Sequence, residues 1–151
     1  MRAVSATVNG AISIVNAIAT GKGAALGISK KVNVEIEASK GSGVTIESKN
    51  KQLSSRLINR VIEKIVPKNE LSKTKFRVYL HSEIPTGYGL KSSSAVSSAV
   101  AMCCAKLFKP KLNDFEILSS GVDASIETKV SLTGAYDDAC ADTNHAWHLK
   151  M

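Results

Sequence analysis

The chain has 151 residues, of which 44% are apolar and 22% are charged, a composition typical of one soluble globular domain. It contains no uninterrupted apolar stretch of roughly 18 residues, the minimum for a membrane-spanning helix, so we expect no membrane partner. The three cysteines are odd in number and two of them are adjacent, which argues against a disulfide framework. A reducing, cytoplasmic location is therefore expected.

The chain is basic, with 20 Lys and Arg against 13 Asp and Glu and a formal net charge of +7. The basic residues are spread along the chain, and aromatic residues make up only 5%, so no stacking platform for nucleic-acid bases is predicted. A surface that attracts small anionic substrates explains the charge equally well, and we expect no nucleic-acid partner. The alternative from a different class is a non-catalytic basic module that binds nucleotide or RNA.

The N-terminal part of the chain is predicted to form strands separated by glycines. Residues 11–19 are apolar and β-branched, and residues 32–37 alternate with period two, as in a half-buried strand. The Gly41-Ser-Gly43 turn then predicts a hairpin that leads into a strand at 44–47. This region therefore supplies several strands of a sheet.

Helices and one further strand follow. They are a helix at 52–66 ended by Pro67, a polar linker at 68–74, a strand at 75–81, a helix at 92–108 and a helix from 113 to about 127. Asn113 and Glu116 have the spacing of a capping box, which supports the start of the last helix. Strands mixed with helices predict an α+β fold.

A glycine- and serine-rich corner lies between the strand at 75–81 and the helix at 92–108. Its glycines allow the backbone to approach a ligand, and its serines lie at a helix start, where unpaired N–H groups and the dipole favour phosphate. Capping a helix needs only one hydroxyl, so three in a row favour a ligand site, although the spacing is not the Walker pattern. The predicted nucleotide site consists of Pro85, Thr86, Gly87, Tyr88, Gly89, Leu90, Lys91, Ser92, Ser93, Ser94 and Ala95.

Two other segments suggest chemistry. The segment Thr133-Gly-Ala-Tyr-Asp-Asp-Ala139 carries Asp137 and Asp138, and in a kinase an aspartate accepts the proton of the acceptor hydroxyl. A solvated acidic turn is the alternative. The segment Asn16-Ala-Ile-Ala-Thr-Gly-Lys-Gly23 carries Lys22, which is suited to contact an anionic ligand. The alternative there is a glycine-rich hairpin with a surface lysine.

The three segments, in this order and with this spacing, resemble the archaeal-type shikimate kinases of the GHMP kinase superfamily from about residue 3 to 141. The resemblance implies phosphorylation of the 3-hydroxyl of shikimate by ATP with Mg²⁺, a step of aromatic amino-acid biosynthesis. It implies Ser93 and Glu127 as Mg²⁺ ligands, Asp137 or else Asp138 as catalytic base, and substrate contacts from Lys22 and Asn16. A same-fold alternative is a kinase for another small alcohol, homoserine or mevalonate.

The resemblance also predicts the domain organisation. Residues 1–141 are expected to form a GHMP-kinase N-terminal domain, with a mixed or antiparallel sheet packed with helices, and residues 142–151 an atypical tail. Because family members are nearly twice as long, the C-terminal domain is expected to be missing through truncation or a frameshift. Full activity is then expected only with a complementing C-terminal half or in a homo-oligomer, since an apolar interdomain face would be left exposed.

Overall fold

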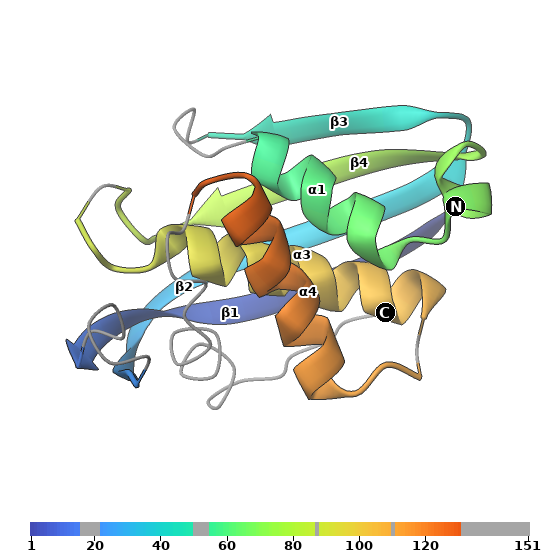
Figure 1. Ribbon diagram of the computed structural model, residues 1–151. Helices are drawn as coiled ribbons and strands as arrows, with labels where there is room; N and C mark the ends of the chain where they lie inside the picture. The colour runs from blue at the N-terminus through green and yellow to red at the C-terminus, as the bar shows by residue number, and fades with distance from the viewer. Residues whose placement is uncertain (16–21, 50–54, 87, 110, 131–151) are drawn as a thin grey trace.

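The computed structural model describes residues 1–15, 22–49, 55–86, 88–109 and 111–130. In this part of the chain, α1, α3 and α4 lie on one face of a four-stranded mixed sheet (Figure 1), which confirms the predicted α+β fold. The elements in chain order are β1 (Arg2–Val15), β2 (Ala24–Lys40), β3 (Gly43–Ser48), α1 (Ser55–Ile65), α2 (Lys68–Leu71), β4 (Thr74–Ser82), α3 (Ser92–Phe108) and α4 (Asp114–Glu127). None of the described helices is long and apolar enough to cross a bilayer.

The strand order in the sheet is β1-β2-β4-β3, so the predicted hairpin between β2 and β3 is wrong. β4 pairs antiparallel with β2 and parallel with β3, and therefore separates them. Gly41 (φ +141°) and Gly43 (φ +95°) adopt positive φ in the turn that follows β2. The Gly41 amide donates to the Lys73 carbonyl just before β4. The nine-residue match of β4 with residues 32–40 satisfies more backbone groups than the six-residue β3 could.

The connection from β3 through α1 to β4 is a left-handed crossover. With α1 toward the viewer in Figure 1, both strands point to the left and β4 lies below β3. About 98% of such crossovers are right-handed, so this chirality is a distinctive property of the fold. The loop that follows β4 leads directly into α3 and lies at the carboxyl ends of the two parallel strands, where ligands bind in many sheets with parallel strands.

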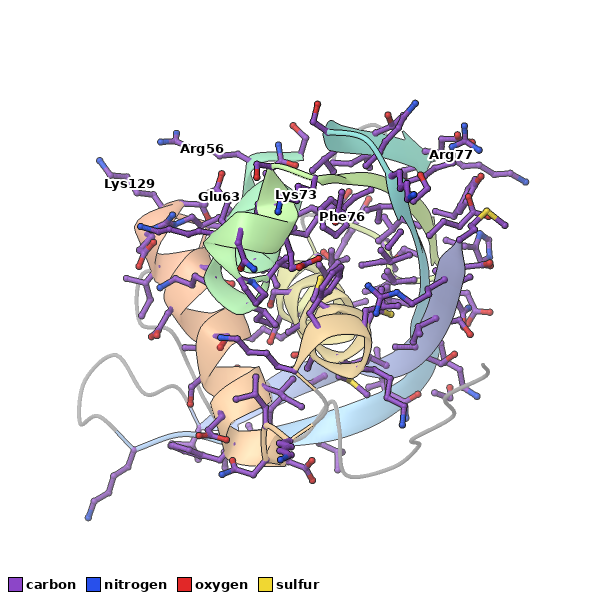
Figure 2. All side chains as sticks on the ribbon, turned by 90° about the vertical axis from the view of Figure 1, so that its right-hand side faces the viewer. Arg56, Glu63, Lys73, Phe76, Arg77 and Lys129 are labelled. Carbon is purple, nitrogen blue, oxygen red and sulfur yellow. The ribbon has the colours of Figure 1, made fainter. Side chains whose placement is uncertain are left out.

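Alternating side chains of the sheet form one half of the core. Phe76 and Val78 of β4 and Ile36 of β2 are at most 1% exposed, and burial of each such side chain stabilises the fold by about 1.5–3 kcal/mol. In Figure 2 the strands curve around α3, with Phe76 on the inner side and Arg77 on the outer side. The period-two alternation predicted for residues 32–37 is thus confirmed.

α3 is the central helix, with 13 of its 17 residues buried. This explains its all-round apolar sequence, since a helix enclosed on every side has no polar face. Burial raises the pKa of the Cys103 thiol to about 12 and raises that of Cys104 as well, so both are protonated core thiols at neutral pH. Cys140 lies outside the described residues.

α4 packs directly on α3 at a glycine. A Cβ on Gly121 would lie 3.3 Å from the Ser97 carbonyl oxygen, so the absence of a side chain allows the two backbones to approach. The predicted capping box is confirmed: the Asn113 side chain accepts from the Glu116 amide at 2.9 Å, and the Glu116 carboxylate accepts from the Asn113 amide at 2.8 Å.

Candidate functional site

The predicted glycine- and serine-rich corner connects the end of β4 to the start of α3 (Figure 1). At its base, the Ser82 hydroxyl donates to the carbonyl of Ile84 and accepts from the amide of the same residue, both at 3.1 Å. Ile84 is buried, whereas Tyr88 is 78% exposed. Gly89 has φ +71°, and a Cβ there would meet nothing within 4 Å. The loop is therefore anchored at its base and open at its tip.

β1 supports this loop through a glycine. A Cβ on Gly10 would lie 2.8 Å from Cδ1 of Ile84 and 3.2 Å from the carbonyl oxygen of Leu90. The pairing of β1 with β2 changes register between Asn9 and Ala11, as at a β-bulge. Gly10 was not among the predicted site residues, although an isolated glycine in a strand-like run is a known signal of close backbone approach.

The start of α3 is uncapped and positively polarised. Its N-cap residue, Lys91, has the left-handed conformation (φ 55°, ψ 35°), and its side chain makes no capping hydrogen bond. The Ala95 amide donates to the Lys91 carbonyl at 3.1 Å. The amides of Ser92, Ser93 and Ser94 therefore precede the helical hydrogen-bond ladder. No acidic residue lies in the first turn, so this end is electrostatically suited to an anion such as phosphate.

The start of α4 provides a contrast within the same chain. Its capping box satisfies backbone donors, and Asp114 and Glu116 place two carboxylates in the first turn. These charges offset the helix dipole at its positive end. Of these two helix starts, that of α3 is therefore the better suited to bind an added anion.

The three serines of α3 do not contribute equally. Ser92 is 8% exposed, while Ser93 and Ser94 are half-buried. Successive side chains of a helix point about 100° apart, so the three hydroxyls cannot all face one ligand. The backbone N–H groups share one direction, toward the helix start, and are the common feature of this site.

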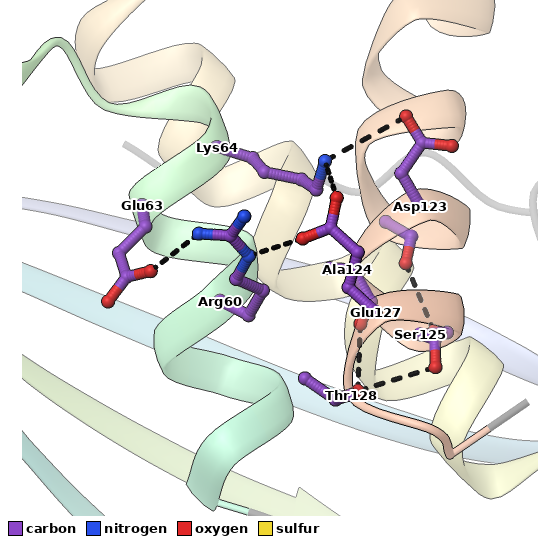
Figure 3. A network of polar contacts seen from close by, with 9 residues as sticks. Arg60, Glu63, Lys64, Asp123, Ala124, Ser125, Glu127 and Thr128 are labelled. Carbon is purple, nitrogen blue, oxygen red and sulfur yellow. Dashed lines mark hydrogen bonds and ion pairs between the residues drawn. The ribbon is translucent and has the colours of Figure 1, made fainter.

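Glu127, the predicted metal ligand on α4, contacts α1 with both carboxylate oxygens (Figure 3). Oε2 accepts from Nε of Arg60 at 2.5 Å and Oε1 from Nζ of Lys64 at 2.6 Å. These bonds, that of Lys64 first, lower the pKa of Glu127 from its ordinary value, and Glu127 in turn raises the pKa of Arg60. Arg60 also pairs with Glu63 at 2.9 Å, and Lys64 lies 4.0 Å from Asp123. We refer to these five residues as the α1–α4 network.

The side chains of Ser93 and Glu127 suit Mg²⁺ chemically. A hydroxyl and a carboxylate are hard oxygen donors, and Mg²⁺ usually takes one or two protein carboxylates together with water and phosphate oxygens. Among the described residues, no three His, Cys, Asp or Glu side chains are grouped so that they could hold a metal ion by themselves. The chemistry of the two donors fits an ion that also binds phosphate oxygens, and their joint action on one ion stays a prediction.

A polar cavity of about 550 Å³ lies between α1 and the end of α4. It is lined by Arg56, Asn59, Arg60, Glu63, Glu127 and Thr128, among others. The Oδ1 atom of Asn59 is buried and has no hydrogen-bond partner. None of the α1 residues was predicted as functional. Their signal was the spacing of basic residues at 56, 60 and 64, which places three cations on one helix face.

The remaining predicted residues are only partly described. Lys22 is exposed and lies two positions before the start of β2. Asn16, Gly87, Asp137 and Asp138 lie outside the described residues. The relation of both aspartates to the start of α3 therefore stays a prediction.

A loop packed on a strand and leading into an uncapped helix start defines the class of this protein, an α+β domain with a helix start that is electrostatically suited to an anion. The family model for the GHMP kinases N terminal domain matches residues 56–144, and the chain belongs to this family. The predicted family is thereby confirmed.

Two curated proteins similar to this chain are shikimate kinases. The chain is 37% identical over 142 residues to the shikimate kinase of Pyrococcus abyssi, covering 91% of this chain and 51% of that protein. It is 40% identical over 136 residues to the shikimate kinase of Methanosarcina mazei, covering 87% of this chain and 45% of that protein. The chain thus spans about half the length of the curated relatives that it matches.

Solved structures confirm the fold. Mevalonate kinase from Staphylococcus aureus matches with a TM-score of 0.71 at 20% identity, covering 99% of this chain and 55% of that chain. Galactokinase from Lactococcus lactis matches with a TM-score of 0.73 at 17% identity, covering 93% of this chain and 41% of that chain. At these identities the likeness concerns the fold alone.

Proposed function

We propose that this chain is the nucleotide-binding half of a shikimate kinase, which transfers the γ-phosphoryl group of ATP to the 3-hydroxyl of shikimate. The observation that carries the proposal is the uncapped start of α3, reached by a loop that packs on Gly10. Support for the substrate comes from the relatives named shikimate kinase, 37% and 40% identical over most of the chain.

In this proposal the segment 85–95 wraps the triphosphate. The amides of Ser92, Ser93 and Ser94 donate to phosphate oxygens, and the α3 dipole lowers the energy of their negative charge. The exposed tip around Gly89 leaves room for the phosphates to approach the backbone. Phosphoryl transfer requires mainly positioning and charge neutralisation, and this helix start contributes to both.

Ser93 and Glu127 would hold Mg²⁺ together with phosphate oxygens. The ion would neutralise charge that develops on the transferred phosphoryl group. Glu127 is suited to this role because a carboxylate is ionised at neutral pH even at its ordinary pKa of 4.5. In the structure, however, its oxygens are held by Arg60 and Lys64, so binding a metal would require changes in these contacts.

The acceptor side of the proposal depends on Asp137, with Asp138 as the alternative. One of the two would orient the shikimate hydroxyl and accept its proton. Lys22 would pair with the shikimate carboxylate, and Asn16 would donate a hydrogen bond to the substrate. Cys103 and Cys104 are free thiols, which fits the cytoplasmic location that we include in the proposal.

Full activity would require the half of the shikimate kinases that this chain does not cover, or another copy of this chain in its place. An apolar surface on the outer part of the β1–β2 pair supports this requirement. Ile12 is 41% exposed, Ile14 66% and Leu26 61%, and Ile12 pairs directly with Leu26. Contiguous exposed apolar side chains commonly mark protein contacts. Of these two partners for the apolar surface, the half of the relatives that this chain does not match fits better. The chain covers only 51% of the Pyrococcus abyssi shikimate kinase.

The proposal is tested with the chain alone and with the chain mixed with the separately expressed remaining half of the Pyrococcus abyssi protein. Each sample is incubated with MgATP and shikimate, homoserine or mevalonate, and products are identified by mass spectrometry. We expect the chain alone to bind MgADP and only the mixture to form phosphoshikimate. Phosphorylation of homoserine or mevalonate but not shikimate would show that the substrate is that alcohol and not shikimate. Salt-sensitive RNA binding without MgADP binding would favour the basic module instead.

A further inference from the structure

The α1–α4 network occupies the oxygens that the proposed metal ion needs. Glu127 places Oε2 against Nε of Arg60 and Oε1 against Nζ of Lys64, at 2.5 and 2.6 Å. Both contacts come from one face of α1, and Figure 3 shows the carboxylate lying between the two cations. Before any ligand binds, therefore, the carboxylate is neutralised by a different helix.

We propose that this network is a latch in which Arg60 and Lys64 compete with the metal ion for Glu127. The inference rests on the proposed function and concerns the same site. When a metal–nucleotide complex binds at the start of α3, Glu127 turns toward the metal and its contacts with α1 weaken. When the complex leaves, the carboxylate returns to Arg60 and Lys64.

Competition follows from electrostatics. Mg²⁺ binds carboxylate oxygens at about 2.0–2.1 Å, so a metal ion on Glu127 would lie within about 5 Å of both cationic groups. A divalent and a monovalent cation at that separation repel each other. The carboxylate therefore cannot hold all three cations at full strength, and each one that binds weakens the others.

The network also contains a second partner for each released cation. Arg60 pairs with Glu63 at 2.9 Å, and Lys64 lies 4.0 Å from Asp123. If Glu127 turns away, Arg60 keeps one carboxylate and Lys64 can move to another, so neither charge is left unpaired. The side chains of Arg60 and Glu127 are 42% and 40% exposed and that of Lys64 is 21% exposed, and ion pairs in contact with solvent are each worth little. In the proposed second arrangement each released cation would keep a carboxylate partner.

Linkage makes the latch measurable without turnover. If the metal weakens the α1 contacts, then the α1 contacts must weaken metal binding by the same factor. Removing a cation from α1 therefore strengthens binding of MgADP relative to ADP without metal. The useful quantity is the dissociation constant of ADP in EDTA divided by that of MgADP. This ratio is insensitive to a general loss of folded protein, which affects both constants.

The experiment measures this ratio by calorimetry for the full 151-residue chain and for the variants Lys64→Gln and Arg60→Gln. Each substitution is expected to raise the ratio about threefold, the effect of a solvated ion pair. Lys106→Gln removes the same charge from the last turn of α3, away from the network, and should leave the ratio unchanged. In a Glu127→Gln background, adding Lys64→Gln should raise the ratio less than it does in the unaltered chain, because the shared carboxylate is absent and only direct repulsion remains.

The outcomes separate the latch from the function on which it rests. An unchanged ratio in both α1 variants would reduce the network to a structural contact and overturn the latch. A lowered ratio would show that the two cations orient Glu127 for the metal, which also overturns competition. If the unaltered chain bound no MgADP, the proposed function would fail and the latch with it, and the first titration would identify that case.

Discussion

Gly10 of β1 and Ile84 of the loop after β4 lie so close that a Cβ on Gly10 would be 2.8 Å from Cδ1 of Ile84. The two residues are 74 positions apart in the chain, and their contact sets how near the loop lies to the sheet. The carbonyl oxygen of Leu90, next to the N-cap of α3, lies 3.2 Å from the same Cβ position. The position of the proposed phosphate site therefore depends on a missing side chain.

Gly10→Ala should displace the loop and weaken MgADP binding. Overpacking of this kind costs about 1–3 kcal/mol of unfolding free energy, measurable by denaturant titration, and calorimetry would report the loss of affinity. The double variant Gly10→Ala/Ile84→Val removes the clashing Cδ1 atom and should recover part of both losses. Full affinity in Gly10→Ala alone would contradict the proposed role of this contact.

Lys91 offers a test that separates backbone strain from charge. Its φ of 55° is left-handed and unfavourable for a residue with a Cβ, by about 1–2 kcal/mol. Lys91→Ala keeps the strain and Lys91→Gly removes it, while both lose the charge. Because glycine also loses more entropy on folding, we expect Lys91→Gly to be more stable than Lys91→Ala by up to about 1 kcal/mol.

Thermal unfolding followed by circular dichroism measures this difference. Equal losses of MgADP affinity in both variants would assign the effect on binding to the lysine charge. A variant Lys91→Ala at least as stable as Lys91→Gly would show that the left-handed conformation carries no strain.

The ion pairs of Glu127 predict that the stability of the fold depends on pH. Its pKa is lowered in the folded protein by Lys64 and Arg60, so the network stabilises the fold above the unfolded-state pKa. That stabilisation is lost as the pH falls through the folded-state pKa. The melting temperature of the unaltered chain should therefore exceed that of Glu127→Gln at neutral pH, and the gap should close below the ordinary carboxyl pKa of 4.5. A gap that does not depend on pH would exclude the ion pairs as its cause.

Asp137→Asn should lower the rate of phosphoryl transfer in the reconstituted enzyme while MgADP binding stays nearly intact. An amide can hold the acceptor hydroxyl but cannot take its proton, and loss of a general base costs about 10²–10⁴-fold. Single-turnover kinetics would measure the rate. Asp138→Asn is the matched comparison. An unaffected rate in Asp137→Asn together with a large loss in Asp138→Asn would identify Asp138 as the catalytic base.

Local patterns in the sequence predicted a large part of the fold. Each of these patterns spans only a few consecutive residues. They are the alternation at 32–37, the helical period of α1, the capping box of Asn113 and the predicted phosphate corner at 85–95. The period of buried side chains and the chemistry of a helix start depend only on near neighbours, so they can be inferred without knowing the rest of the molecule.

What only the tertiary structure decided concerns residues distant in the chain. β4 lies between β2 and β3, so the predicted hairpin is wrong. The pairing of β2 depends on how many backbone groups and apolar side chains a partner strand satisfies, and not on which strand follows the nearest turn. In the same way, Gly10 supports a loop that begins after Ser82, and Arg60 meets Glu127 because α1 and α4 pack on the same helix. The amino-acid sequence by itself determined most of the strands and helices, although residues 68–71, predicted as part of a polar linker, form α2. It also predicted the corner at 85–95 as a phosphate site, which stays a prediction. Packing decided which of those segments touch, because contact free energy depends on side chains brought together from far apart.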